Sequence, residues 1–150
     1  MNPGHQDLRL FHQMLLRLRA VEDQRKKSDI LYDYLHRHAF LEPYLRMAKD
    51  PEIDFRVSSR AVEIALATRD GKPLMRAVLR GPLELLYLFS AQRVDTCIRP
   101  FLWAAYLGTI PDASLRATAN CILDRDLRAG LSWWAIDRAL RLVGSKPLLS

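Results

Sequence analysis

Apolar residues recur every three or four positions along most of the chain, which is the spacing of one face of an α-helix. The segment from Asp7 to Lys27 shows this spacing most clearly. The apolar residues that share its face are Leu8, Phe11, Met14, Leu15, Leu18 and Val21. The pattern predicts a helix over residues 7–27. The polar sequence KKSD at 26–29 then breaks the apolar spacing.

A second helix is predicted over residues 30–41, with Ser28 or Asp29 as its N-cap. Such short polar side chains accept hydrogen bonds from the first free amides of a helix. A short helical turn is predicted over 43–49, and residues 50–59 are expected to form a connection. The first third of the chain is therefore expected to be mainly helical.

Residues 61–79 fit two alternatives. Apolar residues alternate in the first half, and Asp70-Gly71 is a strong turn pair, which together are typical of a β-hairpin. Two short helices are the other alternative. Ser59 suits the N-cap of the first helix and Pro73 the start of the second. Gly71 and Gly81 suit the ends of the two helices. Because every punctuating residue serves the second alternative, we favour helices.

The rest of the chain is punctuated by proline before apolar segments and by glycine after them, as in short helices with tight connections. The further helices are predicted at 82–89, 94–108 with a break at Pro100, 112–128 and 132–143. The pattern predicts an all-α fold, a single compact bundle of about six to seven short helices, with a small β-hairpin at 61–79 as the alternative. One domain is expected over 1–150, with loose tails at about 1–5 and 145–150.

Composition supports an ordinary globular protein, since 49% of the 150 residues are apolar and 27% are charged. The apolar run at 101–108 is far too short to cross a bilayer, so no membrane partner is expected. The N-terminus lacks the pattern of a secretory signal. Cys97 and Cys121 lie in apolar contexts and are expected to be reduced core thiols, which indicates a cytoplasmic protein.

The net charge of +6 permits nucleic-acid binding but does not point to a binding segment. Basic residues outnumber acidic ones by nine to seven in residues 1–50, by eight to six in 51–100 and by six to four in 101–150. The excess is thus spread evenly. Any positive patch has to be assembled by folding.

Two adjacent tryptophans, Trp133 and Trp134, lie in the last predicted helix. Consecutive residues on a helix point about 100° apart, so one stripe cannot hold both centrally. Trp133 falls at the edge of the apolar arc and is expected in the core. Trp134 falls among Asp137, Arg138 and Arg141, and Trp and Arg are enriched at interaction hot spots. The structural alternatives are that the tail covers Trp134 or that an arginine stacks on it.

A second group of this kind is predicted in the helix over residues 94–108. Arg99, Trp103 and Tyr106 gather opposite the apolar side of this helix if Pro100 does not reset its phase. They are candidates for a secondary interface, although for Trp103 itself we favour buried packing.

No motif identifies a reaction. Asp33, His36 and His38 suggest a metal site, but the two histidines diverge by about 200° on a helix, which leaves two ligands at most. Phosphate-binding loops, nucleophile elbows and HExxH are not found. We therefore assign no catalytic, metal-binding or cofactor-binding residue and favour a protein that is not an enzyme.

The segment 112–143 resembles a helix-turn-helix unit, in which two helices are joined by a short turn containing glycine. Gly130 supplies the glycine, and Ile136 is the branched apolar residue expected six positions later. Asp126 stands where that pattern has a small residue, which puts the tight crossing in doubt. The resemblance covers about 30 residues and would place the last helix in a DNA major groove.

The leading hypothesis is a non-enzymatic protein–protein interaction module, acting as an adaptor or regulator. Its contact residues are Trp134, Asp137, Arg138 and Arg141 on the last helix, and its partner surface is acidic or mixed with a hydrophobic centre. A DNA-binding regulator that uses the same face is the alternative, and an enzyme of unknown type is the third. Self-association into a homo-oligomer is also left open.

Overall fold

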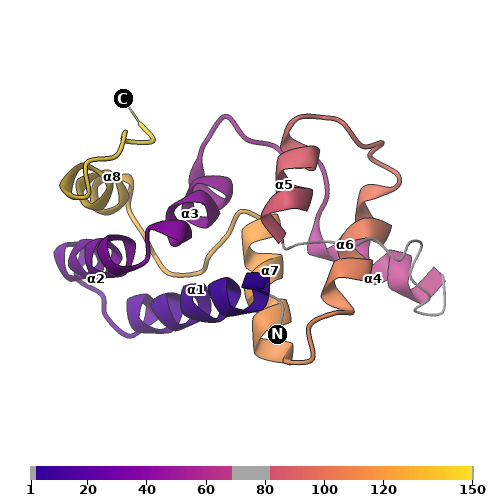
Figure 1. The fold of residues 1–150 in the computed structure, drawn as a ribbon, viewed down its shortest axis with the longest axis horizontal. Coiled ribbons are helices and arrows are strands. Elements are labelled where there is room, and N and C mark those ends of the chain that lie inside the picture. The colour runs from indigo at the N-terminus through magenta and orange to yellow at the C-terminus, as the bar shows by residue number, and fades with distance from the viewer. Residues whose placement is uncertain (1–2, 69–81, 150) are drawn as a thin grey trace.

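A computed structural model describes residues 3–68 and 82–149, and all regular structure in these ranges is helical (Figure 1). The elements are α1 (Pro3–Arg19), α2 (Gln24–Arg37), the 3-10 helix η1 (Ala39–Leu41), α3 (Glu42–Lys49), α4 (Ser59–Thr68), α5 (Pro82–Ser90), α6 (Arg99–Leu107), α7 (Ala113–Leu123) and α8 (Trp133–Leu142). The predicted all-α fold is confirmed, and the predicted six to seven helices come close to the eight α-helices in the described residues. None of these helices has the length and apolar character needed to cross a membrane.

The first two helices divide earlier than the sequence pattern predicted. α1 ends at Arg19, and the Asp23 side chain caps α2 by accepting from the amides of Arg25 at 2.8 Å and Lys26 at 3.3 Å. The predicted helix is therefore confirmed over 7–19 but wrong in its continuation to residue 27, and the predicted caps Ser28 and Asp29 are wrong. The Asp23 carboxylate accepts hydrogen bonds from free amides and so starts a helix at this point. The polar run KKSD does not interrupt this helix and lies within it.

The hairpin alternative fails for the part of it that the structure describes. Residues 61–68 belong to α4, where Val62 and Ala65, three positions apart, are buried. This spacing is that of a helix rather than of a strand. The rest of the expected hairpin, residues 69–79, lies outside the described residues.

The helices form two groups joined by a central set (Figure 1). α2 and α8 pack against each other at one end, and α4, α5 and α6 lie at the other. α1, α3 and α7 lie between them, with α1 and α3 packed on α7. Their buried apolar side chains form one continuous core, which fixes the position of α8 relative to the rest.

The α7–α8 pair does not form the helix-turn-helix unit that the sequence resembles. Nine residues, 124–132, separate the two helices, whereas such units use a turn of about three or four. α8 packs mainly against α2 instead. The glycine spacing was misleading because Gly130, with φ of +59°, belongs to a longer irregular connection.

Polar contacts from α2 hold this connection. The Lys27 ammonium is buried and donates to the Ala129 carbonyl and, at 3.4 Å, to the Gly130 carbonyl. The Gln24 amide donates to the Gly130 carbonyl at 2.7 Å, and its oxygen accepts from the Ser132 amide at 2.9 Å. These contacts set where α8 begins.

We expect Lys27→Met to lower the free energy of unfolding by about 1–3 kcal/mol, because the Ala129 carbonyl loses its buried donor. Urea unfolding followed by circular dichroism measures the loss. Lys26→Met, at an exposed neighbouring position, is the matched control and should change stability by less than about 0.5 kcal/mol. Equal effects of the two substitutions would contradict this role of Lys27.

The structure describes residues 3–5 and 145–149 of the two tails that were expected to be loose, and their looseness stays a prediction. Residues 3–5 are the first residues of α1, and residues 145–149 return along α8 and α3. The segment 145–149 contacts α3 side chains that are distant in the sequence, which the local pattern does not reveal.

Candidate functional site

Residues at the two ends of α8 fix where this helix begins and ends. The Ser132 hydroxyl caps it by accepting from the Ala135 amide at 3.1 Å. At the other end Gly144 adopts φ of +82°, and the Ser145 amide donates to the Leu140 carbonyl at 2.8 Å. One side of the helix is buried, and the opposite side is open to solvent.

Both tryptophans lie on the open side of α8. Trp134 is 56% exposed, as predicted, but Trp133 is 39% exposed, so its predicted place in the core is wrong. The buried face is centred on Ala135, Ile136, Ala139 and Leu140. Trp133 lies beyond the edge of this face.

Each indole has a cation over its ring. The Arg138 guanidinium carbon lies 5.8 Å from the Trp134 ring centroid, and the Lys49 ammonium lies 5.3 Å from the Trp133 centroid. Stacking of an arginine, one of the structural alternatives for Trp134, is therefore present. It leaves more than half of the indole surface uncovered, so stacking and external contact are compatible.

The two arginines beside Trp134 differ in their availability. Arg138 forms an ion pair with Asp29 of α2 at 2.8 Å, with its side chain 28% exposed. Arg141 is exposed, and its guanidinium forms no ion pair or hydrogen bond with residues 3–68 or 82–149. Arg141 is thus the more accessible of the two cations.

Asp137 does not face solvent as its predicted contact role requires. It is buried, and its carboxylate accepts from the amides of Leu148 at 2.7 Å and Leu149 at 3.2 Å. The helical wheel placed it correctly among the polar residues, but the returning chain covers it. We correct its role from partner contact to anchor of this segment.

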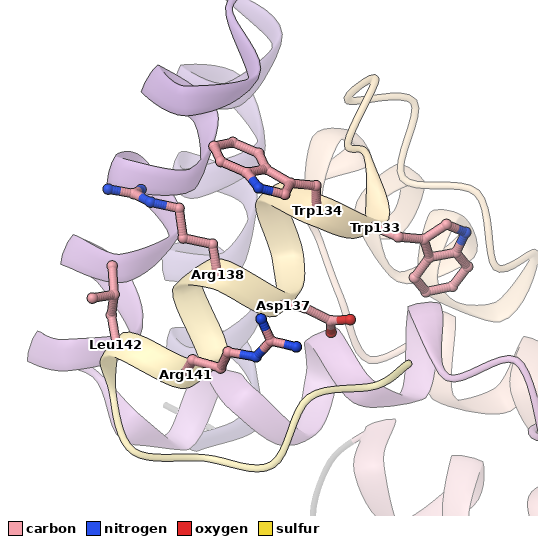
Figure 2. Close-up of a pocket in the computed structure, with 6 residues that line it drawn as sticks. All are labelled: Trp133, Trp134, Asp137, Arg138, Arg141 and Leu142. Atoms are coloured by element: carbon pink, nitrogen blue, oxygen red, sulfur yellow. The ribbon is translucent and has the colours of Figure 1, made fainter. Parts of the chain in front are cut away.

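Figure 2 shows the resulting pocket on α8, a shallow hollow of about 410 Å³. Its lining residues are Trp133, Trp134, Asp137, Arg138, Arg141 and Leu142. The sequence missed Trp133 and Leu142, because both were counted with the apolar arc. Their exposure shows that the arc is wider than the surface that α2 covers.

The secondary interface is wrong, because Arg99, Trp103 and Tyr106 are all buried. The Trp103 indole donates to Asn120 of α7 at 2.9 Å, and α4 and α5 pack against α6. A helix enclosed from several sides buries its nominally polar face too. Cys97, expected in the core, is exposed ahead of α6, whereas Cys121 is partly buried against the core.

An interior polar cluster, which no sequence signal marked, joins Asp7, Tyr44 and Tyr106. The Tyr44 hydroxyl donates to Asp7 at 3.3 Å, and the Tyr106 hydroxyl has no hydrogen-bond partner within the described residues. Burial raises the pKa of both phenols and of the Asp7 carboxyl. Because both phenols are enclosed, they offer no surface to a ligand.

The residues weighed for metal binding are engaged elsewhere. Asp33 pairs with Arg37 at 3.1 Å, and His36 stacks on Tyr32 with ring centroids 5.5 Å apart. In the described ranges no three His, Cys, Asp or Glu side chains come together to hold a metal ion. No known protein family, curated protein sequence or solved structure matches the chain.

Proposed function

We propose that the protein is a non-enzymatic protein–protein interaction module that binds an acidic segment with an apolar centre through the open side of α8. The observation that carries the proposal is the exposed Trp134 ring beside a stacked Arg138 and an Arg141 that forms no ion pair within residues 3–68 and 82–149. An indole between two guanidiniums combines a large apolar area with cationic edges. Binding would bury the ring and bring the partner's carboxylates to the rim.

Charge complementarity sets the chemistry of the partner. Among the residues that line the pocket, the positive charges are Arg138 and Arg141, and the sole carboxylate, Asp137, is directed to backbone amides. Lys49 adds another cation beside Trp133. A basic partner would meet like charges here, whereas an acidic one would gain at the rim.

A role as an adaptor or regulator in the cytoplasm is consistent with this surface and is part of the proposal. Cys97 and Cys121 are free thiols, and Cys97 is exposed, which suits a reducing compartment.

Trp134→Ala tests the proposal with a defined probe, a short capped peptide in which glutamates flank a central Leu-Phe pair. We expect its Kd to rise about tenfold or more, equivalent to about 1.4 kcal/mol, because the ring is the largest apolar element of the contact. The free energy of unfolding should change by less than about 0.5 kcal/mol, since the ring is mostly exposed. Isothermal calorimetry and urea unfolding measure the two quantities.

Leu16→Ala is the matched control, because Leu16 is similarly exposed but lies on α1. It should leave the Kd unchanged, and a peptide with lysines in place of the glutamates should not bind. Wild-type affinity in Trp134→Ala would remove the proposed surface. Binding of duplex DNA with a steep salt dependence that requires Trp134 would instead assign the surface to nucleic acid. Concentration-dependent sedimentation that Trp134→Ala abolishes would assign it to a second copy.

A further inference from the structure

The segment 145–149 is fixed to the body of the protein by contacts from two helices. The Ser145 hydroxyl donates to Glu42 of α3, and Arg46 of α3 donates to the Lys146 carbonyl. Asp137 of α8 accepts from the two consecutive amides of Leu148 and Leu149. The segment thus lies beside the pocket and occupies the carboxylate in its lining.

Asp137 and Arg141 have the spacing of an intrahelical ion pair. An acidic residue four positions before a basic one is the favourable orientation for such a pair. Both side chains project from the same side of α8 in Figure 2. Yet the ion pairs of the described residues do not include this one. Both Asp137 oxygens instead accept from amides of the segment, which orients the carboxylate toward it.

We infer that the segment 145–149 controls the proposed acidic-partner site by keeping the Asp137 carboxylate from pairing with Arg141; the inference rests on the proposed function. While the two amides hold Asp137, the Arg141 guanidinium is available to a partner. Once the segment leaves, Asp137 loses two donors, and the cation one turn along the helix replaces them. Arg141 is then neutralised within the protein, and the site loses its free positive charge.

The attached segment therefore keeps the site in its binding state. Any event that lifts it, such as competition by another chain for the same helices, would lower affinity for acidic partners without touching Trp134. The charge of Arg138 does not depend on the segment, because Asp29 of α2 already pairs with Arg138.

Leu148→Pro tests the inference because it deletes the amide that makes the shorter bond to Asp137. The Kd of the glutamate-flanked peptide should rise about two- to fivefold, the range for losing one exposed charge pair. Adding Asp137→Asn should restore it, since the competing charge is gone. Leu148→Ala, which keeps the amide but loses the same leucine contacts with the core, is the matched control, and its Kd should rise less than that of Leu148→Pro. A Leu148→Pro variant with wild-type affinity would overturn the inference.

A stability cycle decides the question independently of any peptide. Asp137→Asn and Arg141→Gln are made singly and together, in the wild type and in Leu148→Pro. Their shifts of the urea midpoint should add in the wild type and fail to add in Leu148→Pro. Additivity in both backgrounds would overturn the inference, and Leu149→Pro repeats the cycle if Leu148→Pro impairs folding. If the wild type does not bind the peptide, the proposed function fails while this cycle still decides the inference.

Discussion

Replacing Trp103 by alanine should lower the free energy of unfolding by about 3–5 kcal/mol, the range for truncating a large core aromatic side chain. Trp103 is 0% exposed and packs against Tyr106 and Phe89, with ring centroids 5.2 Å and 6.4 Å away. The substitution leaves a cavity between α5 and α6. It also removes the indole N–H that donates a hydrogen bond to the Asn120 side chain of α7. Urea unfolding monitored by circular dichroism measures the loss.

Trp134→Ala is the control for Trp103→Ala, because it deletes the same atoms from an exposed position. The two variants should differ in unfolding free energy by about 3 kcal/mol or more, although both residues were predicted at a contact surface. Similar losses would mean either that α6 is less enclosed than described or that Trp134 packs against the body of the protein.

The contrast between these tryptophans shows what a helical wheel predicts. The wheel gives the directions in which side chains point, and for Trp134 the polar direction is also the solvent direction. For Trp103 the favoured buried packing is confirmed, but the wheel alone placed it on the polar side, because a wheel does not count the helices around an element. α4 and α5 pack on α6, and α7 contacts it through Asn120, so both of its faces are inside. Periodicity thus predicts phase, whereas burial depends on the tertiary arrangement.

The fold was predictable to the level of class and approximate helix positions, because the spacing of apolar residues is a local property. The misplaced features depend on contacts between distant residues or on a cap that was overlooked. Asp23 is of a residue type that favours the N-cap, but the apolar spacing continues through Val21 and favoured one longer helix instead. The burial of Asp137 by Leu148 and Leu149 was not predictable, because no local pattern specifies where a chain turns back.

Arg99→Met should lower the free energy of unfolding by about 2–5 kcal/mol, since it leaves one buried and two partly buried acceptors without their donor. The guanidinium is buried and donates to the carbonyls of Phe55 at 2.6 Å and Val94 at 2.8 Å, and to the Gln92 side chain at 2.9 Å. Methionine fills a similar volume, so the loss reports the hydrogen bonds rather than a cavity.

Two further variants separate geometry from charge at this position. Arg99→Lys keeps the charge but lacks the planar fork that reaches three acceptors, so it should recover less than half of the loss. Arg141→Met removes an exposed guanidinium and should change unfolding by less than about 0.5 kcal/mol. Full recovery by lysine would assign the effect to charge alone. The two arginines therefore differ in their surroundings: Arg99 ties the Phe55 segment to α6, whereas Arg141 is exposed and is expected to contribute little to folding.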